Sequence, residues 1–429
     1  MLLEFSVANF RSIGEEQTLY MQPAIKSKKD DDHNIIQTGI NREPEALPCV
    51  AILGANASGK SNVLKAFSFL KKIIQESVLR KKEDLFEDNC FRLNPTYANK
   101  PTCFRIKFIA LNGHMYQYWL ELVPEEIIRE KLTAIPNTKG AREVTLIDRE
   151  QNKLELHRSI HPKKAFLNVW KAEINNQQTA LALLSNKGEI SIFDSAISWF
   201  KSFGQFTSTN IPEYVTASFI QNETINIEHV THLLKSADIN VHEVNINEKQ
   251  RSLGLSPSEE YIFNDSDGLF NPKLEISFSH LDIQGNPIPF NFQDDESNGT
   301  KTFFSISGMI ILNLYLGTPV AFDELDSALH PYLVRKIIQL FTNKATNPKG
   351  AQLIFSTHDV TVMDKTLLRP DEIYFTEKDK DTFETRLFSL SEFKGVGSVS
   401  KNDRGQKLYK DYLDGRFGAV PEVDWDGGL

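Results

Sequence analysis

The chain has 429 residues, of which 40% are hydrophobic and 24% are charged, and its formal net charge is −9. This composition is that of an ordinary globular protein and excludes a disordered chain, and the length suits two or three domains or one large domain with an insertion. The acidic balance argues against a protein that coats DNA through general basicity. No apolar run has the length of a membrane helix and the first residues lack the regions of a signal peptide, so we expect a cytoplasmic protein with no membrane partner.

A glycine-rich motif follows the short apolar run Val50–Leu53. Residues 54–61 read Gly-Ala-Asn-Ala-Ser-Gly-Lys-Ser, and apolar residues then recur at helical spacing through Ile74. Strand, loop and helix in this order predict a phosphate-binding loop, because glycine lets backbone N–H groups approach a phosphate closely. We expect Lys60 to contact the β- and γ-phosphates of ATP and Ser61 to ligate Mg²⁺. The loop residues expected to contact ATP are Gly54, Asn56, Ala57, Ser58, Gly59, Lys60, Ser61 and Asn62.

The middle of the chain contains two regions with different predicted secondary structure. Residues 103–150 hold two alternating runs around Asn112-Gly113, which predicts a β-hairpin within an antiparallel lobe. From about 166 to 270 the apolar residues recur mainly at helical spacing, without sustained heptads. We therefore expect a short helical arm there, and not a long coiled coil.

Two strands downstream end in candidate catalytic residues. Residues 318–324 form an apolar strand that ends in Asp323 and Glu324. Asp323 would hold the Mg²⁺ shell, and Glu324 would orient and polarise the water that attacks the γ-phosphate. A second apolar strand leads to His358, at the strand end where open α/β sheets bind ligands, so His358 is predicted to donate a hydrogen bond to the γ-phosphate. The alternative interpretations are solvated acids at a strand end and a structural histidine.

Residues 296–300, Glu-Ser-Asn-Gly-Thr, precede a helix-like apolar stretch and resemble a degenerate ABC signature motif. The resemblance implies that Ser297, Asn298 and Gly299 contact the γ-phosphate of ATP held by a second copy of the chain, which would form a homodimer or a higher oligomer. It also implies that Asp326 belongs to the D-loop at the same interface and that His358 is the switch histidine. The alternative interpretation of this segment is a plain helix N-cap and turn.

Further segments are similar to RecF- and SMC-like ATPases, in particular to the overcoming-lysogenisation and RloA/AbiL-type ATPases of bacterial anti-phage systems. They are Leu3–Ile13, Asn56–Asn62, Asp326–Pro331, Asp371–Phe375 and Tyr412–Pro421. The alternative interpretation of the closing segment is a packing turn. The resemblance implies an α/β fold, namely an ABC-type P-loop ATPase head with a mixed sheet flanked by helices, an antiparallel β lobe and a helical insertion. It also places Arg11 close to the nucleotide. The expected parts are the N-terminal part of the head at 1–165, the mainly helical insertion at 166–270 and the C-terminal part of the head at 271–429.

The Q-loop glutamine of this group has no clear counterpart. Gln117 and the pair Gln177-Gln178 are both candidates, and the sequence does not decide between them.

The sequence shows no second catalytic constellation, so we expect any toxic activity to come from another polypeptide. The resemblance implies that this chain hydrolyses ATP and thereby regulates that separate nuclease or toxin effector in abortive infection. Two other classes stay open. A RecF-like DNA repair or maintenance ATPase would bind DNA directly through a contiguous basic groove. A transporter subunit would need a membrane-domain partner. DNA and a phage component are the alternative partners.

Overall fold

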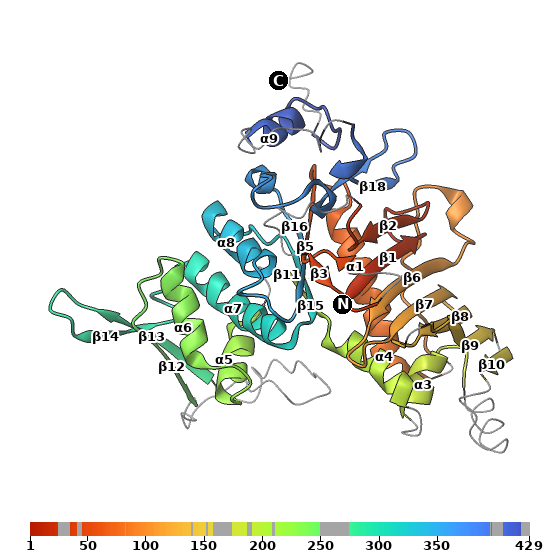
Figure 1. Ribbon diagram of the computed structural model, residues 1–429, viewed down its shortest axis with the longest axis horizontal. Helices are drawn as coiled ribbons and strands as arrows, with labels where there is room; N and C mark the ends of the chain where they lie inside the picture. Colours follow the sequence, from red (N-terminus) through yellow and green to blue (C-terminus); the bar gives the residue numbers. More distant parts are fainter. Residues whose placement is uncertain are drawn as a thin grey trace.

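The structure is a computed structural model. It describes residues 1–24, 35–40, 45–81, 83–138, 140–151, 153–157, 174–186, 191–207, 211–248, 274–394, 396 and 406–421. Two large sheets lie side by side, and a smaller lobe extends from the central one (Figure 1). Among the described helices, none combines the length and the apolar character needed to cross a membrane.

A six-stranded sheet lies at the centre of the molecule and carries the phosphate loop. Its strands are, in spatial order, β11 (Gly204–Thr207), β15 (Pro319–Asp323), β16 (Gln352–Ser356), β5 (Cys49–Gly54), β17 (Ile373–Lys378) and β18 (Thr385–Ser389). Neighbouring strands are parallel except for β17 and β18, which form an antiparallel hairpin. The carboxyl ends of β5, β15 and β16 therefore meet at one edge, where open α/β sheets bind their ligands.

Both faces of the central sheet are buried. In β5, Val50 and Ile52 belong to one hydrophobic core, whereas Ala51 and Leu53 belong to the other. Because side chains of a strand alternate between the faces, two buried faces require the continuous apolar runs seen in the sequence. The helices that supply the two cores are α1 (Lys60–Glu76) on one side, and α7 (Asn298–Leu316) and α8 (Pro331–Thr342) on the other.

The second large sheet is antiparallel. Its strands are, in spatial order, β10 (Lys153–Leu156), β9 (Val144–Glu150), β8 (Glu126–Ile135), β7 (Met115–Val123), β6 (Thr102–Ile109), β1 (Leu2–Ala8) and β2 (Gln17–Tyr20). The hairpin expected at Asn112-Gly113 joins β6 and β7, and Gly113 adopts a φ of 74° that favours glycine. A further short pair is formed by β3 (Ile36–Gln37) and β4 (Glu45–Ala46).

The described part of the expected insertion, 166–270, holds strands as well as helices. Helices α3 (Ala180–Asn186) and α4 (Ser191–Ser202) share the core of the antiparallel sheet and α1, and the rings of Phe108 and Trp199 stack with centroids 4.2 Å apart. The smaller lobe consists of α5 (Glu213–Gln221), α6 (Ile227–Ser236) and the sheet β12 (Glu243–Glu248), β13 (Leu274–Leu281) and β14 (Pro287–Asn291). Both α5 and α6 pack on α7. Residues 158–173 and 249–273 lie outside the described residues, and the domain boundaries stay a prediction.

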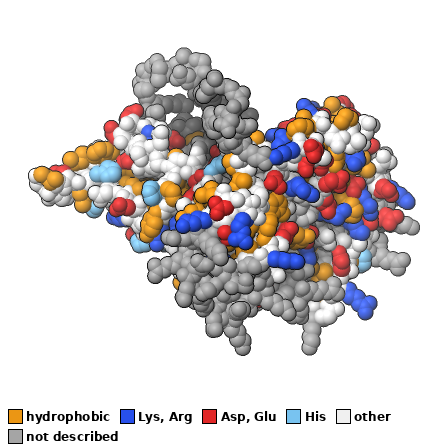
Figure 2. Space-filling view, turned by 90° about the horizontal axis from the view of Figure 1, so that it is seen from above, with side chains coloured by type: hydrophobic (Ala, Val, Ile, Leu, Met, Phe, Trp, Pro, Cys, Tyr) orange, Lys and Arg blue, Asp and Glu red, His pale blue; other side chains and the backbone are white. Residues whose placement is uncertain are grey.

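Strands β13 and β14 form a hairpin that projects from the smaller lobe (Figure 1). Its exposed large hydrophobic side chains are Leu281, Ile283, Ile288 and Phe290. Figure 2 shows hydrophobic side chains gathered along this projection, at the left of the view. Strand β14 pairs only with β13 in the described sheet, and its Pro287 and Pro289 lack the N–H group that another strand would need.

The closing segment packs on the central sheet. The ring of Tyr412 in α9 (Gln406–Leu413) stacks on Phe375 of β17 with centroids 5.2 Å apart. The Tyr412 hydroxyl donates to the carbonyl oxygen of Ala419 at 2.9 Å. At the other end of the chain, the Leu2 N–H donates to Gln352 Oε1 at 2.6 Å. Both ends of the chain thus build one head, and the predicted α/β fold, with a mixed sheet flanked by helices and an antiparallel β lobe, is confirmed.

Candidate active site

The phosphate loop adopts backbone conformations that favour glycine. Gly54 and Gly59 have φ angles of 150° and 109°, and Ala57 between them has a φ of 61°. A Cβ atom at Gly54 would clash with the carbonyl oxygen of Thr376, and one at Gly59 would clash with the side chain of Thr385. The loop is therefore packed closely enough to require glycine at both positions, as a backbone cradle for phosphate does.

Lys60 is the first residue of α1 and is buried, with 6% of its surface exposed. Its ammonium group donates to the carbonyl oxygens of Gly54 at 2.8 Å and Ala55 at 3.0 Å. Burial lowers the pKa of Lys60, and the carboxylate of Asp323 is the largest opposing influence. The amine therefore lies over the loop at the N-terminal end of a helix, where an anion is favoured.

Ser61 and Asp323 come from distant parts of the chain and meet at the edge of the central sheet. The Ser61 hydroxyl donates to Asp323 Oδ1 at 3.0 Å. Hydroxyl and carboxylate oxygens suit Mg²⁺, which is usually held by one or two protein groups together with phosphates. These two residues fit a magnesium ion that arrives with a nucleotide.

A third residue, Ser356 at the end of β16, contacts the carboxylate of Asp323 and the backbone of Glu324. Its hydroxyl donates to Asp323 Oδ1 at 2.5 Å and accepts from the Glu324 N–H at 2.7 Å. Glu324 has a φ of 55°, a left-handed conformation that costs a non-glycine residue roughly 1–2 kcal/mol. No sequence motif indicates a role for Ser356, and the one available signal is its place at the end of the strand that leads to His358.

Glu324 and His358 line one cavity together with the phosphate loop. The cavity has a volume of about 300 Å³, and its lining residues are Ser12, Asn56, Ala57, Ser58, Gly59, Lys60, Ser61, Asn62, Glu324, His358 and Lys378. The backbone N–H of His358 donates to the Asp326 carboxylate, with oxygens at 3.2 and 3.3 Å. One chain thus brings together an amine for phosphate, a hydroxyl and a carboxylate for a metal, and a carboxylate that can act on water.

Arg11 does not line this cavity, although the resemblance places it close to the nucleotide. Its Nε donates to Asn89 Oδ1 at 3.2 Å, and its guanidinium lies 5.7 Å from the ring centroid of Phe10. Its neighbour Ser12 reaches the cavity instead.

The signature segment also lies outside the cavity of its own chain. Ser297 is the N-cap of α7, and its hydroxyl accepts from the Thr300 N–H at 3.1 Å. Asn298 and Gly299 form the first turn of the helix, and a Cβ atom at Gly299 would lie 3.1 Å from the carbonyl oxygen of Ala328. The segment therefore lies beside the loop that follows β15.

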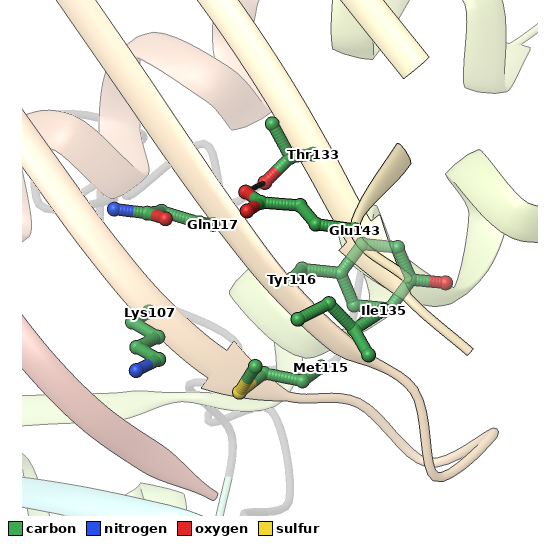
Figure 3. A pocket seen from close by; sticks show the side chains of 7 residues that line it. All are labelled: Lys107, Met115, Tyr116, Gln117, Thr133, Ile135 and Glu143. Atoms are coloured by element: carbon green, nitrogen blue, oxygen red, sulfur yellow. Dashed lines mark hydrogen bonds between the residues drawn. The ribbon is translucent and has the colours of Figure 1, made fainter. Parts of the chain in front are cut away.

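None of the three glutamines considered for the Q-loop lines the cavity, and Gln178 donates to the carbonyl oxygen of Arg80 at 3.1 Å. Gln117 lines a separate pocket of about 160 Å³ on the antiparallel sheet, where Thr133 donates to Glu143 at 2.7 Å (Figure 3). Gln177 is buried, and its amide donates to the carbonyl oxygen of Glu125. In the central sheet, β15 lies between β11 and β16. Residues 208–210, which follow β11, lie outside the described residues.

The hairpin β17–β18 contacts the phosphate loop through hydroxyl groups that no sequence pattern indicates. The Thr385 hydroxyl donates to the Ser58 carbonyl oxygen at 2.8 Å and shares a 2.7 Å hydrogen bond with the Ser12 hydroxyl. The hydroxyls of Thr376 and Ser58 lie 2.6 Å apart. Asn62 donates to the Ser12 hydroxyl at 2.7 Å, so one network joins the loop, the hairpin and the N-terminal strand region.

Comparison with known proteins gives one family match. A family model described as "AAA domain, putative AbiEii toxin, Type IV TA system" matches residues 49–364. No curated protein matches the chain.

Several solved structures are distantly similar. The SMC head domain from Thermotoga maritima has 13% identity and a TM-score of 0.43, covering 90% of this chain and 98% of that one. The Smc head domain with a coiled coil and joint from Pyrococcus yayanosii has 11% identity and a TM-score of 0.45, covering 96% and 99%.

Proposed function

The chain belongs to the AAA domain family described as "putative AbiEii toxin, Type IV TA system", and on this premise we propose that it is an ATP-hydrolysing switch. The observation that carries the proposal is the contact of the Ser61 hydroxyl with Asp323 at 3.0 Å, with Glu324 beside it in the same cavity. A phosphate loop alone would suit a protein that only holds a nucleotide. The second acid adds a group suited to hydrolysis.

In this proposal five residues of the site, together with the backbone of the phosphate loop, divide the catalytic roles. Lys60 and the loop N–H groups bind the β- and γ-phosphates, and Ser61 and Asp323 hold Mg²⁺. When bound, the ion would neutralise negative charge on the phosphate oxygens. Glu324 orients the attacking water and accepts its proton, while His358 donates a hydrogen bond to the terminal phosphate.

We further propose that ATP joins two copies of the chain. The signature residues Ser297, Asn298 and Gly299 lie at a helix N-terminus outside their own cavity, which supports a role across an interface. Asp326, whose carboxylate accepts from the His358 N–H, would connect that interface to the catalytic residues. Hydrolysis would then reopen the pair.

The proposed setting is bacterial anti-phage defence of the RloA/AbiL-like kind, with a separate nuclease or toxin as the regulated effector. The family description, which names a putative toxin and a TA system, supports this setting. The resemblance of the N-terminal and closing segments to that group supports it as well.

Phosphate release from ATP tests the proposed activity. Glu324→Gln should lower the rate about 100-fold or more while ATP still binds, because a general base contributes about 10²–10⁴-fold. Lys60→Ala should weaken ATP binding itself. Glu155→Gln, a change at an exposed residue of β10, serves as the matched control and should leave both properties unchanged.

An unaltered rate for Glu324→Gln would overturn the assigned role of this residue. Failure of the unaltered chain to bind ATP would overturn the proposed function as a whole.

A further inference from the structure

The cavity lies at the end of β5, with Glu324 and His358 on the side of β15 and β16 and Lys378 on the side of β17. Under the proposed function, on which this inference rests, Glu324 and His358 take the terminal phosphate. Ser12 and Lys378 line the cavity as well, and Ser12 accepts a hydrogen bond from Asn62, the last loop residue. The sugar and base of a nucleotide should therefore extend toward Ser12 and Lys378.

An exposed aromatic ring lies next to Lys378. Lys378 closes β17, and the turn that follows carries Phe383, whose surface is 49% exposed. The Lys378 ammonium lies 5.8 Å from the centroid of the Phe383 ring. The turn itself is anchored near the loop, because Thr385, two residues further along, contacts the Ser58 carbonyl oxygen.

Hydrogen bonds hold this turn in one conformation. Asp379 Oδ1 accepts from the N–H groups of Asp381 at 3.0 Å and Thr382 at 2.8 Å. The carbonyl oxygen of Asp379 accepts from the Phe383 N–H at 3.0 Å. The Asp379 N–H donates to the carbonyl oxygen of Glu384 at 2.9 Å. The backbone at Phe383 is thus fixed before any ligand arrives, which lowers the entropy lost on binding.

The backbone at Phe383 is one that a phenylalanine adopts at a cost. Its φ is 59°, in the left-handed region that glycine and asparagine occupy more readily. A phenylalanine here is neither buried nor favoured by the turn. Strained positions of this kind are often found at ligand sites.

We infer that the Phe383 ring is the platform on which the nucleotide base stacks, with Lys378 lying between the ring and the phosphates. Every nucleobase has an aromatic face, so stacking tolerates different bases. The site should therefore bind adenine and guanine nucleotides with similar affinity, while inorganic phosphates bind without this contribution.

Calorimetric binding of Mg²⁺ complexes of ADP, GDP and inorganic pyrophosphate tests the inference. Phe383→Asn removes the ring and retains a residue suited to the left-handed backbone, so the turn should persist. We expect ADP and GDP to bind about tenfold more weakly and pyrophosphate to bind unchanged. Phe383→Tyr should bind all three ligands as the unaltered chain does.

Phe290→Ala is the matched control, since Phe290 is an exposed phenylalanine on the distant hairpin β13–β14. Its affinities should equal those of the unaltered chain. If Phe383→Asn binds ADP as tightly as the unaltered chain, the inference is overturned and the proposed function stands. If the unaltered chain binds neither ADP nor pyrophosphate, the proposed function fails, and the inference fails with it.

Discussion

At the scale of single residues, Ser356 connects the two acids of the candidate site. Its hydroxyl donates to Asp323 and accepts from the Glu324 N–H, so one side chain positions the proposed metal ligand and the proposed base. Glu324 also occupies a left-handed conformation, which persists only where neighbours hold it.

Replacement of this hydroxyl should impair catalysis more than binding. For Ser356→Ala we expect ATP hydrolysis to fall about 10- to 100-fold, because a hydrogen bond to a charged group is worth about 1.5–3 kcal/mol. Phosphate release and nucleotide binding are measured in parallel. The control is Ser307→Ala, which changes a buried serine of α7 whose hydroxyl donates to the Phe304 carbonyl oxygen at 2.7 Å. Equal rates for the two variants would contradict a positioning role.

A second single residue, Glu372, makes stability depend on pH. It is buried before β17, its Oε2 accepts from the Arg369 N–H at 2.8 Å, and its Oε1 has no hydrogen-bond partner among the described residues. Burial raises the pKa of Glu372 to about 8 from an ordinary value of 4.5. Its contribution to stability is therefore complete below about pH 4.5 and is lost as the pH rises through about 8.

Glu372→Gln replaces the carboxyl by a group that stays neutral. The difference in thermal midpoint between this variant and the unaltered chain should shift in favour of the variant as the pH rises from 5 to about 9. Thermal unfolding followed by circular dichroism at several pH values checks this. A difference that stays constant across the range would show that Glu372 titrates at an ordinary pKa in the folded protein.

At the scale of elements, a buried carboxylate fixes α3 to the antiparallel sheet. Glu130 of β8 accepts from the Ala180 N–H at 2.6 Å and the Leu181 N–H at 2.9 Å, and thus caps the helix. It also accepts from the Tyr118 hydroxyl at 3.0 Å and lies 3.7 Å from Arg149. The helix keeps its place because its first N–H groups have this partner.

Glu130→Ala should destabilise the protein by about 3–5 kcal/mol, since it leaves the Arg149 charge buried without its carboxylate. Glu155→Ala on the exposed part of β10 should change stability by less than about 0.5 kcal/mol. Chemical unfolding measures both. Similar unfolding midpoints for the two variants would mean that the chain satisfies Arg149 and α3 in another way.

The sequence predicts those elements of the site whose signal is local. The order of strand, glycine loop and helix at 49–76, the acidic strand ending at Asp323 and the strand before His358 are all present. The β17–β18 hairpin could not be predicted as part of the site. Its contacts are single hydroxyls, and Ser58 and Thr376 are separated by 318 positions. Similarly, β11 joins the central sheet by pairing with β15. This pairing could not be predicted, because the sequence around β11 has the periodicity of helices.

At the scale of the whole molecule, the signature segment and the phosphate loop lie apart within one chain. This is the arrangement expected if each site is completed by a second copy. We expect Glu324→Gln to double its mass in solution when Mg-ATP is added, as measured by light scattering, because bound ATP then persists between the copies. A monomer at saturating ATP would contradict the proposed closure.

Mixed variants distinguish this closure from other kinds of assembly. Lys60→Ala lacks the phosphate-binding amine, and Ser297→Arg should block the signature face. Each variant alone should hydrolyse ATP poorly. A mixture should recover part of the activity, because a mixed pair keeps one site with an intact loop from one chain and an intact signature from the other. No recovery would place Ser297 outside the partner's site.

The assembly of the head from both ends of the chain has a consequence for synthesis. Ser58 and its partner Thr376 are separated by 318 positions, which a ribosome at about 5–20 residues per second covers in roughly 15–60 s. Until β16 has been synthesised, β5 has neither of its neighbours, β16 and β17, and its apolar edges are open to other chains. A nascent chain therefore has its phosphate loop long before Asp323 and Glu324, so the proposed hydrolysis cannot begin until these two acids have been synthesised.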